Sequence, residues 1–294
     1  MPAAAVDSQM LVVRTVEEAR KMVRKWRAEG LSVGLVPTMG ALHEGHLSLI
    51  RRSNALAERT IASIFVNPAQ FAPHEDFGTY PRREETDLAL LKKEGCDLVF
   101  APSSEEMYPA GFQTAVSVAS VSQGLCGASR PHFFGGVATV VCKLLNQVAP
   151  DIAVFGEKDY QQLLVIRRMA KDLDLPVEIV GAPIVREADG LAMSSRNAYL
   201  NADERKIAGA LNKVLSKMAD RLSRGDAIGE AIHFGRTTLG EAGFTSIDYL
   251  EIRNAETLEP AGSGAVTAPS RIFAAVILGS TRLIDNWPVT SDSR

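Results

Sequence analysis

Two histidines, His43 and His46, stand three residues apart after an apolar run, next to Gly40 and Gly45. Side chains three apart on a helix share one face, so both imidazoles can reach one ligand. Glycines allow a ligand close to the backbone, and a helix N-terminus offers unpaired N–H groups and a positive dipole end. The spacing therefore predicts a phosphate-binding turn whose histidines stabilise charge as it develops on phosphate oxygens.

The same histidines have two other interpretations, namely incidental loop residues or zinc ligands. Zinc proteases place two histidines four apart with a glutamate between them. Here the spacing is three, with a glycine between, and no third ligand lies near in the sequence. We therefore favour the phosphate-binding interpretation.

A second candidate segment begins at Gly156, where a turn opens a helix. Lys158 can neutralise phosphate charge there, and Asp159 can contact ribose hydroxyls or help to hold Mg²⁺. Gln162 lies one helical turn further on and can share their direction. Favourable acids in a first helical turn would explain Glu157 and Asp159 without a ligand, but they leave Lys158 unexplained.

Two further polar segments can contact a substrate. Ser194, Ser195 and Arg196 offer two hydroxyls and a guanidinium, which suit a phosphate clamp, although a helix-capping loop has the same composition. Gln70 offers an amide donor and acceptor for a substrate with hydroxyl and carboxylate groups, although an ordinary polar loop explains it equally well.

Alternating strand-like and helical segments in the first two thirds of the chain must position these residues. Near-continuous apolar strands separated by helices indicate a Rossmann-like α/β fold, with a parallel sheet covered by helices on both faces. Such sheets bind ligands at the carboxyl ends of their strands, where the candidate segments fall. The expected strands are 31–36, 60–66, 97–100, 114–121, 152–155 and 177–180, and the expected helices are 15–29, 45–57, 84–95, 136–148 and 160–172.

The rhythm changes near residue 187, which predicts a smaller α+β C-terminal domain. We expect domains at 1–187 and 188–294, the second acting as a lid over the nucleotide with a hinge near 186–190. Its expected helices are 202–222 and 227–242, and its expected strands are 247–252 and 272–278.

The composition is ordinary for a soluble globular protein, with 46% hydrophobic and 23% charged residues. The 294 residues carry a net charge of −3, which gives no sign of nucleic-acid or anionic-membrane binding. No apolar run is long enough to span a bilayer, and residues 1–8 look like a loose tail rather than a signal peptide. Three widely spaced cysteines, Cys96, Cys126 and Cys142, form no zinc or disulfide pattern, so we expect a cytoplasmic location.

The predicted phosphate-binding turn also resembles the sequence signature of a known superfamily. His43-Glu44-Gly45-His46 resembles the His-x-Gly-His signature of the nucleotidylyltransferase and class I aminoacyl-tRNA synthetase superfamily. The longer string 37–46 is similar to that of the pantothenate synthetase (pantoate–β-alanine ligase) family. The resemblance runs from Leu11 to Leu283 and is densest over 36–200.

The resemblance implies ATP-dependent condensation of D-pantoate with β-alanine through pantoyl adenylate, releasing AMP and pyrophosphate, for coenzyme A precursor biosynthesis. It also implies Mg²⁺ and a homodimer, and it makes 1–187 the nucleotide- and pantoate-binding domain. The residues it implies for catalysis are His43, His46, Lys158 and Arg196, with Gln70 and Gln162 for pantoate. Those it implies for ATP are Met39, Gly40, Ala41, Leu42, His43, Glu44, Gly45, His46, Gly156, Glu157, Lys158, Asp159, Val185, Met193, Ser194, Ser195 and Arg196.

Two segments depart from the family pattern. The family has Arg-Pro-x-His-Phe-x-Gly-Val before the long helix, whereas residues 130–137 place Phe133 at the histidine position and shift the histidine to His132. The family often carries an acidic run near Asp87, but here Thr86 precedes it, and Asp87 is carried over as a candidate metal ligand.

Two rival functions share these features. A nucleotidylyltransferase that leaves AMP on its product has the same fold and turn, but it does not call for the paired Gln70 and Gln162 or a second, amine substrate. A non-catalytic nucleotide-binding protein would explain the altered segment 130–137, but not the intact histidines, lysine and Ser-Ser-Arg segment.

Overall fold

The computed structural model describes residues 10–72 and 75–289, and the chain divides into two compact units. The first unit takes Met1–Ser117, Gly135–Phe155 and Ile166–Ala182, and the second takes Val118–Phe134, Gly156–Val165 and Pro183–Arg294. The domain boundary expected between residues 187 and 188 stays a prediction. Two stretches that precede the expected boundary, Val118–Phe134 and Gly156–Val165, belong to the same unit as the C-terminal part of the chain.

None of the helices within the described residues is both long and apolar enough to cross a membrane. The loose tail expected at 1–8 lies outside the described part of the chain.

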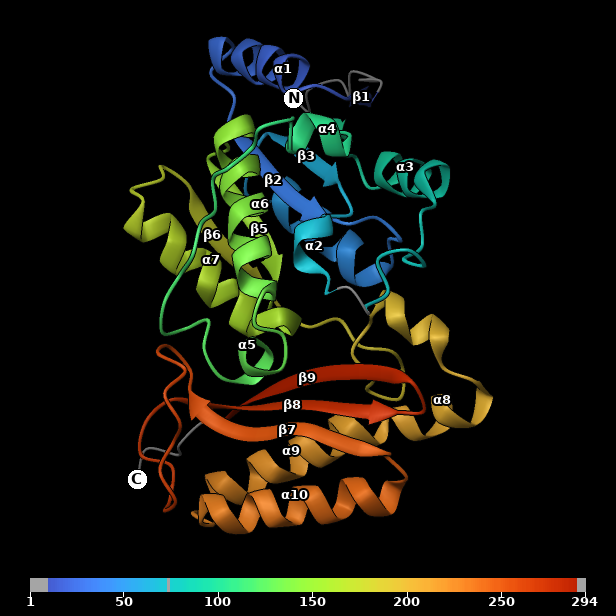
Figure 1. The fold of residues 1–294 in the computed structure, drawn as a ribbon, viewed down its shortest axis with the longest axis vertical. Helices are drawn as coiled ribbons and strands as arrows, with labels where there is room; N and C mark the ends of the chain where they lie inside the picture. The colour runs from blue at the N-terminus through green and yellow to red at the C-terminus, as the bar shows by residue number, and fades with distance from the viewer. Residues whose placement is uncertain (1–9, 73–74, 290–294) are drawn as a thin grey trace, which may run out of the picture. The chain divides into compact units, whose positions relative to one another are not determined.

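The first unit is built on a six-stranded sheet in the order β1-β4-β3-β2-β5-β6 (Figure 1). The pairs β1–β4, β4–β3, β3–β2 and β2–β5 are parallel, which confirms the Rossmann-like prediction. The strand order reverses at β2, because β3 follows on one side of it and β5 lies on the other. The strands are β1 (Leu11–Val13), β2 (Val33–Thr38), β3 (Arg59–Ile64), β4 (Leu98–Phe100), β5 (Ile152–Gly156) and β6 (Glu178–Ala182).

Helices cover both faces of this sheet because right-handed crossovers to either side of β2 fall on opposite faces. On one face α2 and α3 bury Ile50 and Leu91 against Val36, Ala62 and Val99. On the other, Arg20 of α1 donates to the Gln147 carbonyl of α6 at 3.3 Å. The helices are α1 (Val16–Ala28), α2 (Glu44–Asn54), α3 (Glu84–Lys93), α4 (Ser104–Met107), α6 (Phe133–Val148) and α7 (Tyr160–Asp172).

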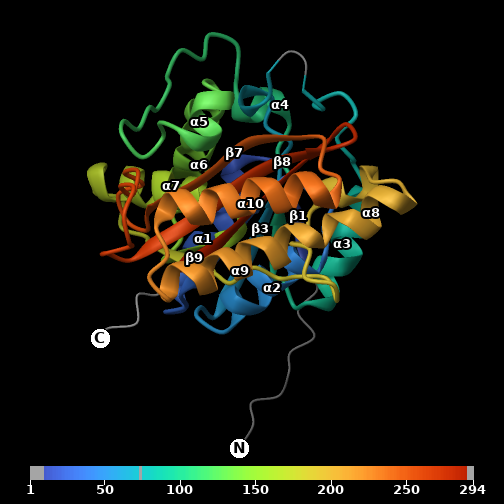
Figure 2. The ribbon, with the colours of Figure 1, turned by 90° about the horizontal axis from the view of Figure 1, so that it is seen from below.

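The second unit contains an antiparallel sheet in the order β7-β8-β9. Figure 2 shows α9 and α10 running side by side across it, and their apolar faces form a core with the strands. This confirms the predicted α+β C-terminal part. Its elements are α5 (Leu125–Ser129), α8 (Ala202–Ala208), α9 (Ala210–Ser223), α10 (Ile228–Ala242), β7 (Ser246–Asn254), β8 (Ser270–Leu278) and β9 (Thr281–Val289).

Two predicted elements differ from the structure. The strand expected at 114–121 is wrong, because the segment is largely exposed and the Val116 N–H donates to Thr139 Oγ1 rather than to a neighbouring strand. The helix expected at 202–222 divides at Gly209, where an added Cβ would lie 2.5 Å from Asp189 Oδ2. The short edge strand β1, the last strand β9 and the short helices α4 and α5 were not predicted.

Candidate active site

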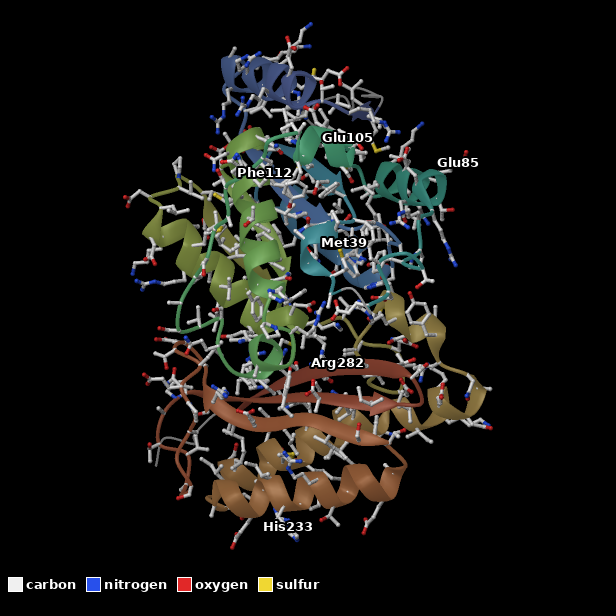
Figure 3. All side chains as sticks on the ribbon, in the orientation of Figure 1. Met39, Glu85, Glu105, Phe112, His233 and Arg282 are labelled. Carbon is white, nitrogen blue, oxygen red and sulfur yellow. The ribbon has the colours of Figure 1, made fainter. Side chains whose placement is uncertain are left out.

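The predicted phosphate-binding turn joins β2 to α2, and Met39 marks its start in Figure 3. His43 is the N-cap of α2, and its Nδ1 accepts the Gly45 N–H at 3.1 Å. His46 Nδ1 accepts the His43 N–H at 3.4 Å, and the two ring centroids are 4.1 Å apart. Because each Nδ1 accepts a hydrogen bond, each neutral imidazole carries its proton on Nε2, the form that can donate to a phosphate oxygen.

Asp87 of α3 holds this turn in place. Its side chain is buried, and its two carboxylate oxygens accept the Ala41 N–H at 2.9 Å and the Leu42 N–H at 2.8 Å. Gly40 and Ala41 have φ values of 79° and 51°, and that region is costly for alanine. The charged acceptor therefore stabilises a strained backbone. Metal binding by Asp87 stays a prediction that these contacts do not test.

Gln70 lies beside the same turn, at the end of η1 (Pro68–Gln70), and its Nε2 lies 3.1 Å from Met39 Sδ. Buried Asn67 orients it, because Asn67 Nδ2 donates to Gln70 Oε1 at 3.2 Å and to the Gly136 carbonyl at 3.1 Å. Tyr108 Oη donates to Asn67 Oδ1 at 2.8 Å, and burial raises the Tyr108 pKa to about 12, so it stays a donor. This role of Asn67 was not predicted from the sequence.

The predicted lysine lies in the second unit, in η2 (Glu157–Asp159) between β5 and α7. The backbone carbonyls of Glu157 and Lys158 each accept a hydrogen bond from Asn286 Nδ2 at 2.9 Å. Arg271 lies 3.5 Å from the Glu157 carboxylate and stacks 3.9 Å from the Tyr160 ring centroid. The Lys158 backbone is therefore fixed by residues of the small sheet.

Of the two adjacent glutamines on α7, Gln161 has a structural role. Its Oε1 accepts the Cys126 N–H at 3.1 Å, and its Nε2 donates to the carbonyls of Val121, Gln123 and Gly124 at 3.1 to 3.2 Å. Gln162 takes no part in these bonds and is half-buried. This division of labour agrees with the choice of Gln162 for pantoate, which remains a prediction.

The remaining ATP candidates form one local structure in the second unit. The Met193 N–H donates to the Val185 carbonyl at 3.0 Å, which brings the predicted adenine contact next to the Ser-Ser-Arg segment. Ser194 Oγ accepts the Arg196 N–H at 3.3 Å and caps η3 (Ser195–Tyr199). The helix-capping alternative is therefore correct for Ser194, and it does not conflict with phosphate binding by the same segment.

The structure thus groups the candidates in two sets. The first set lies in the first unit, where hydrogen bonds connect the turn 39–46 with Gln70 and Asp87. The second set lies in the second unit and consists of Gly156–Asp159, Gln162, Val185 and Met193–Arg196. No group of three or more His, Cys, Asp or Glu side chains that could hold a metal ion occurs within 10–72 and 75–289.

The structure explains the presence of Phe133 in the altered segment 130–137. The Arg130 guanidinium lies 3.9 Å from the Phe133 ring centroid, and Phe133 packs edge-on against Phe134 at 5.0 Å. The displaced His132 is exposed.

The fold and the two histidines at the start of α2 define a nucleotide-using α/β enzyme, and comparison with known proteins gives its family. A family model described as pantoate-beta-alanine ligase matches residues 11–288. The pantothenate synthetase of Paramagnetospirillum magneticum is 58% identical over 275 residues, covering 94% of this chain and 96% of that protein. That of Caulobacter vibrioides is 57% identical over 280 residues, covering 95% and 98%.

Solved structures agree with these relatives. The pantothenate synthetase of Thermus thermophilus superposes with a TM-score of 0.90 at 47% identity, covering 95% of this chain and 99% of that one. Pantoate-beta-alanine ligase from Francisella tularensis, complexed with beta-gamma ATP and beta-alanine, gives 0.80 at 31% identity, covering 95% and 98%. This chain belongs to the pantoate–β-alanine ligase family, and it is a ligase.

Proposed function

We propose that this chain joins D-pantoate to β-alanine in two steps driven by ATP. The observation that carries the proposal is the His43–His46 pair at the start of α2, with Gln70 next to it, in a chain of this family. The Francisella relative was solved with an ATP compound and β-alanine, two of the three substrates that the reaction needs.

In the first step a pantoate carboxylate oxygen attacks the α-phosphorus of ATP. The bond from that phosphorus to the bridging oxygen breaks, pyrophosphate leaves, and pantoyl adenylate forms. In the second step the β-alanine amine attacks the acyl carbon, the bond to AMP breaks, and the amine loses a proton. No covalent enzyme intermediate is required, so positioning and electrostatics supply most of the rate.

Each candidate residue has a role in these steps. His43, His46, Lys158 and Arg196 neutralise charge on the phosphates, with Ser194 and Ser195 holding the β- and γ-phosphates as pyrophosphate leaves. The N–H groups at the start of α2 add a positive dipole end. Gln70 and Gln162 orient pantoate, and the Val185 backbone contacts adenine.

Three further proposals rest on the family resemblance. Mg²⁺ enters as MgATP and screens the phosphates, the protein works in the cytoplasm, and it assembles as a homodimer. Sedimentation velocity at micromolar concentration tests the last, and a species of 31.7 kDa throughout would contradict it.

The reaction is tested by incubating the protein with MgATP and D-pantoate, with and without β-alanine. We expect AMP and pantothenate only when all three substrates are present. Pyrophosphate without pantothenate would keep the adenylation chemistry and favour a nucleotidylyltransferase. No turnover at all would favour a non-catalytic nucleotide-binding protein.

A further inference from the structure

Strand β9 of the small sheet contacts two of the segments proposed for ATP, η2 and η3. Two adjacent buried residues, Asp285 and Asn286, lie at its middle, 3% and 2% exposed. Successive residues of a strand point to opposite faces, so their side chains leave β9 in opposite directions. Each is a polar group that burial would penalise unless it were hydrogen-bonded.

Asn286 hydrogen-bonds through both its amide nitrogen and its oxygen to one segment and its support. Its Nδ2 donates to the Glu157 and Lys158 carbonyls, both at 2.9 Å, and its Oδ1 accepts from Arg271. Arg271 in turn pairs with the Glu157 carboxylate at 3.5 Å. Two successive carbonyls held by one amide fix the direction in which the Lys158 side chain leaves the backbone.

From the other face of β9, Asp285 supports the segment around Val185, which carries the proposed adenine contact. Its carboxylate accepts two hydrogen bonds from the Arg186 guanidinium, at 2.7 and 3.0 Å, a bidentate pair that is among the stronger side-chain contacts. Arg186 also donates to the Gly190 carbonyl at 3.1 Å, which closes the short loop 186–190. Val185, whose carbonyl pairs with the Met193 N–H, directly precedes this anchored arginine.

We infer that Asp285 and Asn286 are positioning residues, which fix the adenine-contacting and phosphate-neutralising segments from one strand. The inference rests on the proposed function, because the segments matter only if they bind ATP. The two residues should then affect kinetics differently. Asn286 acts through Lys158, which stabilises charge developing in the transition state, so its loss lowers kcat. Asp285 acts through a ground-state contact to adenine, so its loss raises the ATP KM.

The experiment measures pantoate-dependent exchange of labelled pyrophosphate into ATP, which reports adenylation alone, together with overall pantothenate formation. The variants are Asn286→Ala, Asn286→Asp and Asp285→Asn. Thr281→Val is the matched control, because Thr281 is buried on the same strand and its Oγ1 has no hydrogen-bond partner within the described residues. All rates are taken per folded molecule, from the circular-dichroism signal.

We expect both Asn286 variants to lower exchange kcat by about tenfold, the scale for supporting contacts around a functional group, with the β-alanine KM unchanged. Asp285→Asn should raise the ATP KM by a similar factor, and Thr281→Val should behave as wild type. In a Lys158→Ala background, Asn286→Ala should add little, because both act through one side chain.

Two results overturn the inference. One is lower stability in the Asn286 variants with unchanged kinetics per folded molecule, and the other is a full additional loss in the Lys158→Ala background. If Asn286→Ala does not fold, Asn286→Asp, which keeps the oxygen that accepts from Arg271, gives the same comparison. A wild-type protein that forms no pantothenate would instead overturn the proposed function, so the two failures are distinguishable.

Discussion

His46 is the residue whose proposed role is most direct. Its Nδ1 is occupied by the His43 N–H, so its remaining nitrogen is the donor that we assign to a phosphate oxygen. We expect His46→Ala to lower kcat/KM by about 10²-fold or more, the usual effect of losing one donor that stabilises developing charge. Lys158→Ala should do the same. His233→Ala, at an exposed position on α10 labelled in Figure 3, is the control and should leave kcat/KM unchanged.

Asp87 gives a second test at the residue scale. In Asp87→Asn an amide nitrogen replaces one carboxylate oxygen and faces a backbone N–H, so one bond to the turn is lost and a buried donor is left unpaired. We expect kcat/KM for ATP to fall by about tenfold, with a lower unfolding temperature. Glu85→Gln, an exposed position on the same helix, is the control. Unchanged ATP kinetics would show that the turn keeps its conformation without the carboxylate.

At the scale of elements, the close approach of α6 to η1 allows a matched pair of substitutions. A Cβ at Gly136 would lie 2.2 Å from the Ala69 carbonyl oxygen and 2.8 Å from the Gln70 N, whereas one at Gly135 would meet nothing within 4 Å. Gly136→Ala must therefore displace the backbone that carries Gln70. We expect a lower unfolding temperature and a raised pantoate KM, measured by calorimetry and steady-state kinetics.

Gly135→Ala, the control for this pair, should leave the pantoate KM unchanged. It should also stabilise the helix by about 0.5–1 kcal/mol, the usual gain from replacing a helical glycine with alanine. Equal effects of the two substitutions on the pantoate KM would contradict the proposed support of Gln70 by α6.

Elements with strong periodicity and clear end signals could be predicted from the sequence. Helix α7 spans the predicted 160–172, and α1 lies within the predicted 15–29, with Thr15 and Glu18 forming a capping box. The strand expected at 114–121 failed because alternation reports a pattern of side chains and not the presence of a neighbouring strand. Strand β9 was missed because two of its buried residues, Asp285 and Asn286, are polar for reasons that only their distant partners explain.

At the scale of the whole molecule, the candidate residues were predictable because they occur in short segments with recognisable chemistry. Supports such as Asp87 and Asn286 were not, because each lies far along the chain from the segment it holds. Asp87 is more than forty positions from the turn it stabilises, at |i−j| of 45 and 46. Asn286 is separated from Lys158 by 128 positions. Such pairs are defined only by the tertiary fold, so a single sequence carries no local signal for them.

The residues that we propose contact ATP lie on three segments far apart in the sequence, 39–46, 156–159 and 193–196. A single ligand that contacts all three must slow amide exchange in all three together. We expect this in hydrogen–deuterium exchange with MgATP, in the absence of pantoate to prevent turnover, while β7 serves as an unchanged reference. Protection of one segment alone would contradict the shared site. A lid hinged at 186–190 would also make amide exchange in that loop depend on MgATP. The Arg186–Asp285 ion pair holds this loop against β9, so it favours a hinge before Arg186.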